Sequence, residues 1–294
     1  MRTVAGIITF NPNIELLEKN IQSIIDQTSV VVICDNGSNN IRDIEEKATQ
    51  YKIVLIKLKQ NYGIAFALNV INEWCVVNGY DWLLTLDQDS EVQSGLVNKY
   101  IEYTNIKDVA MMSCEFMSRD DCEKTTNNIP YGDDYNYIEK CYTSGSFINT
   151  NIIKKVGGFD EYLFIDFVDF DMCITLLENN YKIIRINYLG LIHEVGKTKE
   201  VSFFGQKEQI YNHNSIRKYY MSRNGIIYAR KHRHYFGKRE TLKRVLSVFK
   251  RAILVLLYEN NKFNNIKKEI SGTIAGITSR KKQWNKNVSK KEII

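Results

Sequence analysis

An α/β fold with a mostly parallel central sheet is predicted for this chain by the alternation of strand-like and helix-like segments in its first half. The strand-like segments are five short apolar runs: Val4–Phe10, Val30–Cys34, Ile53–Leu58, Trp82–Leu86 and Val109–Cys114. Between the first two runs, Leu17, Ile21 and Ile24 recur at helical spacing, and a similar pattern follows Gly63. Because helices alternate with strands, we expect them to cover both faces of the sheet.

The bulk composition is that of a globular protein. With 294 residues, of which 44% are hydrophobic, the chain is long enough to bury a large core. Its apolar run Val4–Phe10 is broken by Gly6 and followed at once by Asn-Pro, which is typical of neither a signal peptide nor a membrane span. We therefore expect a cytoplasmic protein. Six cysteines without a C-x-x-C pair argue against a zinc site and against a disulfide framework.

Polar loops follow the predicted strands at the places where open parallel sheets bind ligands, beyond the carboxyl ends of the strands. Four such loops contain clusters of polar residues: Thr9–Pro12, Asp35–Ser38, Asn61–Gly63 and Asp87–Ser90. These loops are therefore the first places to search for a functional site.

The turn that contains Asp87 and Asp89 is a candidate metal site. Two carboxylates separated by one residue can point the same way, and hard oxygen ligands suit Mg²⁺ or Mn²⁺ bound together with substrate phosphates. The alternative is an ordinary polar turn at the start of a helix, which Asp and Ser also favour. A short motif of this kind recurs by chance, so its weight depends on the other loops.

The loop that begins at Asp35 is a candidate nucleoside site. Gly37 permits a tight turn, and the Asp35 carboxylate can accept a hydrogen bond from a pyrimidine N3–H. Thr9 and Asn11, at the end of the first strand, are expected to lie beside Asp35 and to help hold a nucleoside. An Asx turn that only joins a strand to a helix is the alternative interpretation.

The second half of the chain is predicted to continue the α/β pattern after a long loop. Residues Met117–Tyr137 are polar and acidic with several turn signals, and long loops of this kind are often lids. An acid-rich stretch up to Asp171 precedes a helix that ends near Asn179, and a strand is expected at Ile183–Tyr188.

Taken in order, these motifs resemble those of a known family. The segments that carry the resemblance are Thr9–Asn11, Asp35–Ser38, Asn61–Asn69, Asp87–Ser90, Ser144–Ser146, Gly158–Glu161 and Asp169–Asp171. They are similar to the family 2 glycosyltransferases with the GT-A fold, which use nucleotide-activated sugars and invert the anomeric centre. The resemblance covers about the first two-thirds of the chain.

Two features resemble the bacterial rhamnosyltransferases in particular. The aspartate motif reads D-Q-D-S, and the later acidic segment reads Phe-Ile-Asp-Phe-Val-Asp over residues 164–169. The common family pattern has Glu-Asp where this chain has Val168 and Asp169, a departure that fits the rhamnosyltransferase subgroup. The resemblance implies transfer of L-rhamnose from dTDP-L-rhamnose in bacterial surface polysaccharide synthesis, with a UDP-sugar as the alternative donor.

The resemblance also implies contacts to the nucleotide-sugar and to a divalent cation. Nucleotide-sugar contacts are expected from Thr9, Asn11, Asp35, Asn61, Gly63, Asp87 and Gln88. Mg²⁺ or Mn²⁺ is expected on Asp87 and Asp89, with the ribose as an alternative partner of Asp87. His193 stands where many relatives carry a histidine near the metal or diphosphate, and a neutral imidazole suits a third ligand position. A structural histidine is the alternative.

Asp169 is expected to be the catalytic base by its match to the family motif. Inversion by direct displacement needs a group that takes the acceptor hydroxyl proton as the new bond forms. Asp166, Asp169 and Asp171 lie in a hydrophobic run, where desolvation and mutual repulsion raise the pKa of a carboxyl group. Asp166 is expected to position an acceptor hydroxyl. Acids that stabilise a helix N-terminus are the alternative explanation for one or two of the three.

Further acceptor contacts are expected from two other segments. Gly145 and Ser146 lie in a Ser-Gly-Ser motif whose glycine lets the backbone approach a sugar closely, although an ordinary turn is an equal alternative. Arg223 lies in a segment, residues 217–224, that resembles one found after the catalytic core of the same rhamnosyltransferases. It is expected to face the acceptor, which would be a saccharide or a lipid-linked saccharide.

Two regions are expected along the chain. Residues 1–205 would form the GT-A catalytic domain, with a nucleotide-sugar-binding half at residues 1–115 and an acceptor and catalytic-base half at residues 138–205. Residues 206–294 would form a basic, mostly helical C-terminal region.

The C-terminal region contains a predicted basic amphipathic helix. The net charge of the chain is only +6, yet nine Lys or Arg residues stand against the single acid Glu240 between Arg230 and Arg251. An apolar stripe at helical spacing runs through the same stretch: Leu242, Val245, Phe249, Ile253 and Leu256. Such a helix can lie on an anionic membrane, which would place the protein at the inner face of the cell membrane. The alternative is packing on the catalytic domain or on a second copy in a homo-oligomer.

Other classes of function have less support. No nucleic acid partner is expected, because no aromatic-basic motif of a known type is present. Processive polysaccharide synthesis is disfavoured, because membrane spans and a Gln-x-x-Arg-Trp motif are missing. A non-catalytic nucleotide-binding protein at a membrane is the remaining alternative to an enzyme.

Overall fold

The structure of the chain, a computed structural model, describes residues 1–118, 135–193, 198–203, 206–211, 214–259 and 262–280. Its first part alternates strands and helices in this order: β1 (Thr3–Thr9), α1 (Ile14–Ile24), β2 (Val30–Asp35), α2 (Ile41–Gln50), β3 (Val54–Lys57), α3 (Ile64–Val77) and β4 (Trp82–Asp87). The first four predicted strands are confirmed, each within one residue at either end.

The second part of the α/β region is less regular. Its elements are β5 (Glu91–Val92), α4 (Leu96–Glu102), β6 (Val109–Ser118), β7 (Tyr135–Tyr137), β8 (Ser146–Asn149), α6 (Thr150–Lys155), the 3₁₀ helix η1 (Glu161–Leu163), α7 (Val168–Glu178) and β9 (Lys182–His193). The two ends of the predicted long loop are therefore strands, β6 and β7, while residues 119–134 lie outside the described part of the chain. Helix α7 begins at Val168, so Asp169 and Asp171 lie on its first turn.

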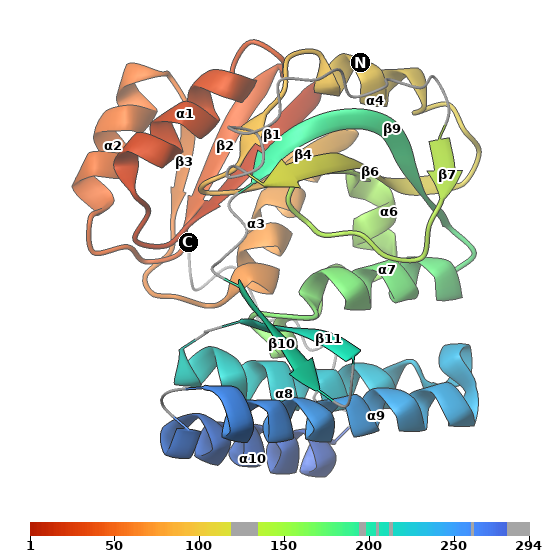
Figure 1. Cartoon of the computed structure of the whole chain (residues 1–294). Coiled ribbons are helices and arrows are strands. Elements are labelled where there is room, and N and C mark those ends of the chain that lie inside the picture. Colours follow the sequence, from red (N-terminus) through yellow and green to blue (C-terminus); the bar gives the residue numbers. More distant parts are fainter. Residues whose placement is uncertain (119–134, 194–197, 204–205, 212–213, 260–261, 281–294) are drawn as a thin grey trace.

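The described strands form one nine-stranded sheet and a separate two-stranded sheet. The path of the large sheet is β3-β2-β1-β4-β8-β6-β9-β5, with β7 paired to β9 (Figure 1). Strands β1, β2, β3 and β4 are parallel, and β8 runs antiparallel between β4 and β6. Because β6 is antiparallel to β8, it runs the same way as β4. The carboxyl ends of β1, β2, β4 and β6 therefore meet at one edge of the sheet.

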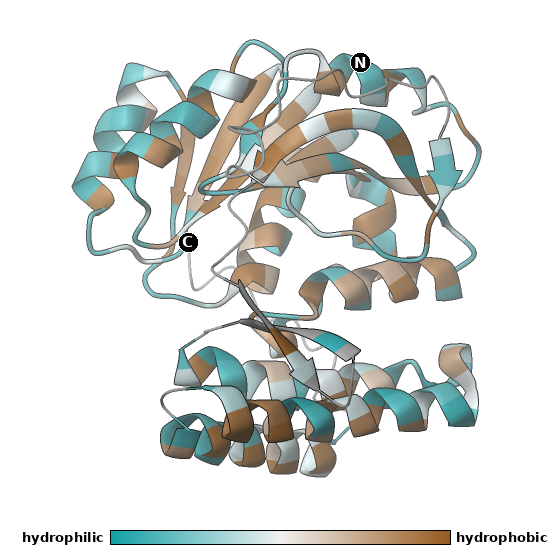
Figure 2. Ribbon diagram, in the orientation of Figure 1, coloured by the Kyte–Doolittle hydropathy of each residue, from teal (hydrophilic) through white to brown (hydrophobic). Residues whose placement is uncertain are grey.

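Two apolar layers cover the sheet. In β1, Val4 packs on the side of α3, α6 and α7, whereas Ala5 and Ile7 pack on the side of α1 and α4. All three side chains are fully buried. Figure 2 shows the consequence, since the strands are largely hydrophobic while the outer surfaces of α1 and α2 are largely hydrophilic. The sheet is thus covered on both faces, as the sequence predicts.

The C-terminal region consists of a hairpin and three helices: β10 (Thr198–Phe203), β11 (Gln206–Tyr211), α8 (Ser215–Lys231), α9 (Arg233–Tyr258) and α10 (Lys262–Thr278). Helix α10 packs so closely on α8 that a Cβ on Gly276 would lie only 2.7 Å from the Arg223 carbonyl oxygen. A buried ion pair between Lys218 and Glu259 further joins α8 to the end of α9. The domain boundary expected at residue 205 falls between the two paired strands of the hairpin, so its position stays a prediction.

Two further observations bear on the sequence analysis. In the described part of the chain, five cysteines are free thiols, and all of them except Cys141 are buried. No described helix combines the length and the apolar content that crossing a bilayer requires.

Candidate active site

The nucleoside loop, residues Asp35–Ser38, is built around the Asp35 carboxylate. Thr9 lies opposite Asp35 in the pairing of β1 with β2, and its hydroxyl donates to Asp35 Oδ1 at 3.0 Å. The backbone N–H groups of Gly37 and Ser38 donate to Oδ2 at 3.1 and 2.9 Å, and the Ser38 hydroxyl donates to Oδ1. Asp35 is only 1% exposed. The structure therefore contains the Asx-type turn and also brings Thr9 against the same carboxylate.

Asn11 joins the loop after β1 to the nucleoside loop. Its N–H donates to the Ser38 hydroxyl oxygen at 2.7 Å, and its side-chain oxygen accepts the N–H of Asn39 at 2.8 Å. Asn11 has a φ of 48°, which is a left-handed conformation that asparagine tolerates better than most residues. The loops after β1 and β2 thus form one cross-braced unit, and their contact with a nucleoside stays a prediction.

Gly63, in the loop after β3, lies against Phe164 in the acidic segment that precedes α7. Its φ is 92°, and a Cβ there would lie 2.5 Å from the Phe164 carbonyl oxygen. The same oxygen accepts the N–H of Ile64 at 2.7 Å. Asn61 supports the turn by accepting the N–H of Gly63 at 2.9 Å. Only glycine fits here, because both the backbone conformation and the space exclude a side chain.

The aspartate turn follows β4 and is tied to its neighbours on both sides. The Gln88 side-chain oxygen accepts the N–H of Phe10 at 2.8 Å, which joins the turn to the loop after β1. The Asp87 N–H donates to the Ser144 hydroxyl at 3.2 Å, and that hydroxyl lies 2.7 Å from the hydroxyl of Ser90. The D-Q-D-S turn and the Ser-Gly-Ser motif are therefore one structural unit.

The Ser-Gly-Ser motif forms a tight turn beneath the aspartates. Gly145 has a φ of 78°, its N–H donates to the Thr85 carbonyl at 2.8 Å, and its carbonyl accepts the Tyr100 hydroxyl. Ser146 is fully buried and donates to the Tyr142 carbonyl. Both residues therefore act on the shape of this turn, while their expected contact with an acceptor stays a prediction.

Asp87 and Asp89 provide oxygen ligands of the kind that a divalent cation prefers. Asp87 ends β4 and lies close enough to Asp169 for its charge to influence that carboxyl group. The described residues contain no group of three His, Cys, Asp or Glu side chains that would hold a metal by themselves. His193 ends β9 opposite Ser118, but its side chain lies outside the described part of the structure. The donor set fits a cation that is shared with a substrate diphosphate, and the His193 ligand stays a prediction.

Asp169 has a carboxyl group with a strongly raised pKa. Burial raises its pKa from 3.8 to about 7, the carboxylates of Asp166 and Asp87 add to the rise, and the N–H of Phe170, which donates to Oδ1 at 2.9 Å, opposes it. No described Lys, Arg or His side chain forms an ion pair with Asp169. A carboxyl group with a pKa near neutrality suits proton transfer.

The two neighbouring acids are both paired. Arg217 from α8 donates to Asp166 through Nε at 3.1 Å and through Nη2 at 2.9 Å. Asp171 is 2% exposed and lies against Lys231 at 2.7 Å and His232 at 2.9 Å. Although burial acts to raise the pKa of Asp171, the Lys231 ammonium and the hydrogen bond from His232 hold it below its ordinary value. Of the three acids, Asp171 is therefore structural, and Asp169 is the one available for chemistry.

The acid loop, residues Asp160–Asp171, has a strained backbone. Phe164, Asp166 and Phe167 have φ values of 65°, 62° and 66°, which are uncommon for residues with a side chain. Such conformations persist only where the surrounding structure enforces them. Here Asn224 of α8 donates to the carbonyls of Leu163, Ile165 and Asp166 at 2.7, 2.7 and 3.0 Å. One side chain therefore spans the strained turn that precedes Asp169.

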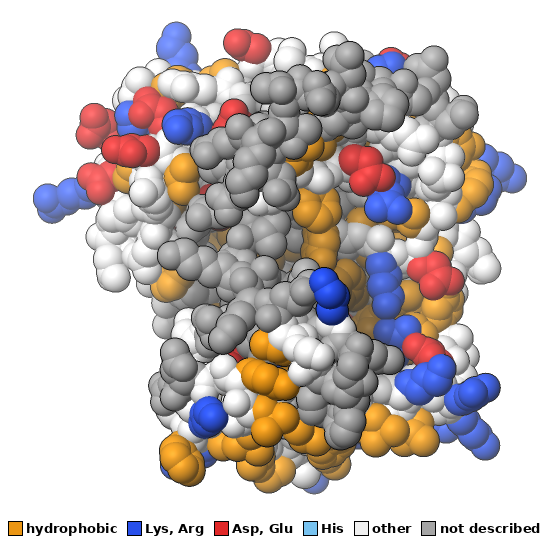
Figure 3. All heavy atoms as spheres, in the orientation of Figure 1, with side chains coloured by type: hydrophobic (Ala, Val, Ile, Leu, Met, Phe, Trp, Pro, Cys, Tyr) orange, Lys and Arg blue, Asp and Glu red, His pale blue; other side chains and the backbone are white. Residues whose placement is uncertain are grey.

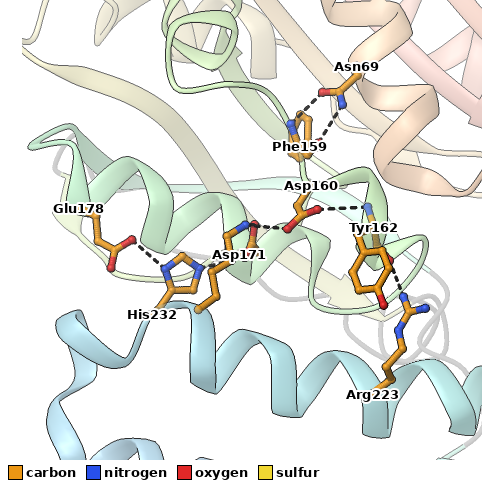
Figure 4. Close-up of polar contacts among 9 residues, drawn as sticks. Asn69, Phe159, Asp160, Tyr162, Asp171, Glu178, Arg223 and His232 are labelled. Atoms are coloured by element: carbon orange, nitrogen blue, oxygen red, sulfur yellow. Dashed lines mark hydrogen bonds and ion pairs between the residues drawn. The ribbon is translucent and has the colours of Figure 1, made fainter. Parts of the chain in front are cut away.

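A buried polar network fixes the two ends of the acid loop to α8 (Figure 4). Lys231 bridges Asp160 at 2.8 Å and Asp171 at 2.7 Å, and His232 joins Asp171 to Glu178. At the start of the loop, Asn69 of α3 accepts the N–H of Phe159 and donates back to its carbonyl, both at 2.8 Å.

Arg223 also supports the acid loop. Its guanidinium donates to the carbonyls of Tyr162 and Leu163 and lies over the ring of Tyr162, with 9% of the residue exposed (Figure 4). The structure places Arg223 behind the acid loop, so a direct acceptor contact stays a prediction. Sequence reasoning did not predict the supporting roles of Asn224, Lys231 and His232, and only the resemblance of residues 217–224 to rhamnosyltransferase segments pointed toward this helix.

Comparison with known proteins agrees with this geometry. The sequence model of glycosyl transferase family 2 matches residues 5–159, more than half of the chain. The chain belongs to glycosyl transferase family 2. The protein is therefore a glycosyltransferase that uses a nucleotide-sugar donor. A curated relative, the dTDP-rhamnosyl transferase RfbF of Shigella flexneri, is 27% identical over 290 residues, which are 93% of this chain and 94% of that protein.

Solved structures confirm the predicted GT-A-type fold. TarS of S. aureus (residues 1–349), in complex with UDP-GlcNAc, matches with a TM-score of 0.60 at 14% identity, over 92% of this chain and 79% of that one. GalNAc-T7 with UDP, GalNAc and Mn²⁺ matches with a TM-score of 0.58 at 11% identity, over 92% of this chain and 54% of that one. At these identities the similarity shows the fold alone.

Proposed function

We propose that this glycosyltransferase moves L-rhamnose from dTDP-L-rhamnose to a hydroxyl group of a saccharide or lipid-linked acceptor, with inversion at the anomeric carbon, in the synthesis of a bacterial surface polysaccharide. The observation that carries the proposal is Asp169, a carboxyl group with a pKa near 7 that lies within electrostatic reach of Asp87 in the aspartate turn. The relative in Shigella flexneri, which resembles this chain over nearly its whole length, favours dTDP-rhamnose as donor.

Proton transfer is the role of Asp169 in this reaction. The acceptor oxygen attacks C1 of the donor sugar from the face opposite the diphosphate, the C1–O bond to the diphosphate breaks, and the Asp169 carboxylate takes the hydroxyl proton. In this proposal Asp166, which lies in the preceding turn and is held by Arg217, orients the acceptor hydroxyl. A divalent cation on Asp87 and Asp89 would neutralise the charge that grows on the leaving diphosphate.

The donor binds across the carboxyl ends of β1, β2 and β4 in this proposal. The cross-braced loops that contain Thr9, Asn11 and Asp35 hold the pyrimidine nucleoside, and the turn at Asn61 and Gly63 lies beneath the sugar. A thymine and a uracil present the same N3–H and carbonyl edge to Asp35, so the nucleoside loop accepts both. The proposed preference for the dTDP donor therefore rests on the relative and not on Asp35.

A donor panel tests the function. Purified protein is given dTDP-rhamnose, UDP-glucose and UDP-GlcNAc in separate reactions with Mg²⁺ or Mn²⁺, and the release of nucleoside diphosphate is measured. We expect release from dTDP-rhamnose above that from the UDP-sugars, with loss after EDTA and recovery on adding the metal back. Release from a UDP-sugar alone would replace the proposed donor. Activity that survives EDTA would contradict the role of Asp87 and Asp89.

We further propose that the enzyme works at an anionic membrane surface, with the acceptor carried on lipid. All residues of the predicted apolar stripe of α9 are exposed except Val245, which is half-buried. Together with Leu246 and Leu257, the exposed residues form the apolar face of α9, which is 45–59% exposed: Leu242, Leu246, Phe249, Ile253, Leu256 and Leu257. Hydrophobic side chains of α10 extend this area, and Lys or Arg side chains flank it in Figure 3. An exposed apolar area of this size rimmed by cations fits the interfacial region of an anionic bilayer.

Vesicle binding tests the membrane proposal. The full chain is mixed with phosphatidylcholine vesicles with or without phosphatidylglycerol, and the bound fraction is measured after sedimentation. We expect binding only with the anionic lipid, weakened by salt and by Phe249→Glu. Val77→Glu, at a 74% exposed position on α3, is the matched control and should bind like the native protein. Formation of a dimer that buries Phe249 would favour a homo-oligomer in place of the membrane.

A further inference from the structure

Three aromatic side chains at or next to the acid loop form a row of neighbouring rings, and two of them are largely exposed. We name them the aromatic shelf: Phe116 of β6, Tyr142, and Phe170 of α7. The ring centroids of Phe116 and Tyr142 lie 5.9 Å apart, and those of Tyr142 and Phe170 lie 5.8 Å apart. Phe116 is 46% exposed and Tyr142 is 56% exposed. Adjacent aromatic rings that are exposed on a protein surface are typical of a binding site.

The shelf adjoins the proposed reaction centre on two sides. Phe170 follows Asp169 directly, and its N–H donates to the Asp169 carboxylate at 2.9 Å. Tyr142 lies two residues before Ser144, whose hydroxyl accepts the N–H of Asp87. The shelf therefore extends from the base to the turn that holds the aspartates. Figure 3 shows hydrophobic side chains along a hollow between the α/β layers and the C-terminal helices.

The shelf is too far from the nucleoside loop to serve the donor base. Asp35 ends β2, whereas Phe116 lies near the end of β6, and β1, β4 and β8 stand between these two strands. Four strand intervals correspond to about 19 Å at the usual spacing of neighbouring strands. A nucleoside at Asp35 and a ligand on the shelf can therefore be bound at the same time, with the aspartate turn between them.

The chemistry of the shelf fits a carbohydrate ring. A pyranose has one face made of C–H groups, which packs on an aromatic ring, and an edge of hydroxyl groups, which needs polar partners. The shelf offers the rings, Asp169 offers a carboxylate next to Phe170, and the charge of Asp166 lies near that carboxylate. Lys140, whose Nζ lies 5.8 Å from the centroid of Phe170, adds a hydrogen-bond donor at another side. A lipid chain would be a poor occupant, because it would bring the two carboxylates into an apolar environment.

We propose that the aromatic shelf is the acceptor subsite, where the C–H face of the terminal acceptor sugar stacks on Tyr142 and Phe116 and its reacting hydroxyl points to Asp169. This inference rests on the proposed function, because it assigns the acceptor side of the same reaction. It implies that the acceptor ends in a pyranose and that recognition at this point depends on ring shape more than on charge.

Ligand-observed NMR tests the shelf without knowledge of the natural acceptor. The full chain, with Mg²⁺ and dTDP, is mixed with the methyl glycosides of rhamnose, glucose, galactose and N-acetylglucosamine, and saturation transfer from the protein to each glycoside is recorded. We expect transfer to the C–H protons of one face of at least one glycoside. Tyr142→Ala should reduce it several-fold, whereas Tyr142→Phe should retain it because the ring remains.

Two controls keep the interpretation specific. Tyr137→Ala removes a 58% exposed aromatic side chain from β7. Tyr137 pairs with the first part of β9, whereas Phe116 pairs with its last part, so the variant should leave the saturation transfer unchanged. The Tyr142 carbonyl, which accepts the Ser146 hydroxyl, is kept in every variant. Failure to bind dTDP would count against the proposed function. Normal dTDP binding with no glycoside contact, or with contact that Tyr142→Ala does not change, would overturn the shelf alone.

Discussion

The nucleoside loop and the acid loop of this glycosyltransferase hold their carboxylates in opposite ways. Asp35 is satisfied by its own turn and by Thr9 on the neighbouring strand. The acid loop depends on α8, because Asn224 reaches carbonyls that lie 58 to 61 residues earlier in the chain. The comparison teaches that the Asp35 turn is held within the edge of the sheet, whereas the turn before Asp169 is held by the C-terminal region, so the proposed donor and base sites have separate supports.

The largest expected effect comes from removing the base. Asp169→Asn should lower sugar transfer about 10²–10⁴-fold, the usual contribution of a positioned general base. Binding of dTDP should remain, because the groups that hold Asp35 come from Thr9, Gly37 and Ser38. Initial transfer rates and dTDP titration by calorimetry measure the two effects. Transfer within a few-fold of the native rate would remove Asp169 from the mechanism.

Loss of the α8 support should have the next largest effect. Asn224→Ala leaves three carbonyls of the strained loop without their shared donor, so we expect kcat to fall about 10–10²-fold through misplacement of Asp169. The KM for the donor should change little. Asn78→Ala, at an exposed position where the side chain bonds only to the Trp74 carbonyl, is the matched control. An equal loss of donor affinity in Asn224→Ala would show that the two loops are not separable.

A change in the nucleoside loop, in contrast, should affect donor binding alone. Ser38→Ala removes the hydroxyl that donates to Asp35 and accepts from Asn11, so the nucleoside loop loses its cross-brace. We expect the donor KM to rise about tenfold, as for loss of a hydrogen bond to a charged group, with kcat nearly unchanged. Steady-state kinetics with varied donor measures both constants. A fall in kcat without a change in KM would contradict the division of roles.

The smallest expected effect is on stability. The native Asp169 carboxyl has a pKa of about 7 against 3.8 when unperturbed, so between these pH values the native state binds more protons than the unfolded state. Its contribution to stability therefore declines as pH rises through this window. Asp169→Asn should raise the melting temperature at pH 8, by about 2–4 °C for each kcal/mol recovered, and change it little at pH 4. A rise of equal size at both pH values would contradict the shifted pKa.

The same comparison explains what the sequence could and could not predict. The nucleoside loop is encoded in short motifs, because Asp35, Gly37 and Ser38 make their bonds to one another. The first four strands were likewise predicted within one residue, since apolar runs and turn signals are local. Strand β8 was missed because it has only four residues and merges with the start of α6.

The support of the acid loop depends on contacts between residues far apart in the chain. Nothing in the sequence near Asn224 indicates that its side chain bonds to backbone carbonyls about 60 residues earlier. Likewise, nothing near Lys231 indicates that its partner is Asp160, about 70 residues earlier. The left-handed conformations of Phe164, Asp166 and Phe167 were also hidden, because no glycine marks them. Three acids at close spacing predicted a shared site, but only the structure separates the paired Asp166 and Asp171 from Asp169.

The dependence of transfer on pH tests the account most directly. We measure kcat/KM for the acceptor from pH 5 to pH 9 with the native protein, because this constant reports the ionisation of the free enzyme. The account predicts a rate that falls tenfold for each pH unit below about 7, as Asp169 takes up its proton, and that levels off above. The residual activity of Asp169→Asn should lack this acid limb. A native rate that stays constant down to pH 5, or an acid limb that persists in Asp169→Asn, would contradict the assignment of Asp169 as the base.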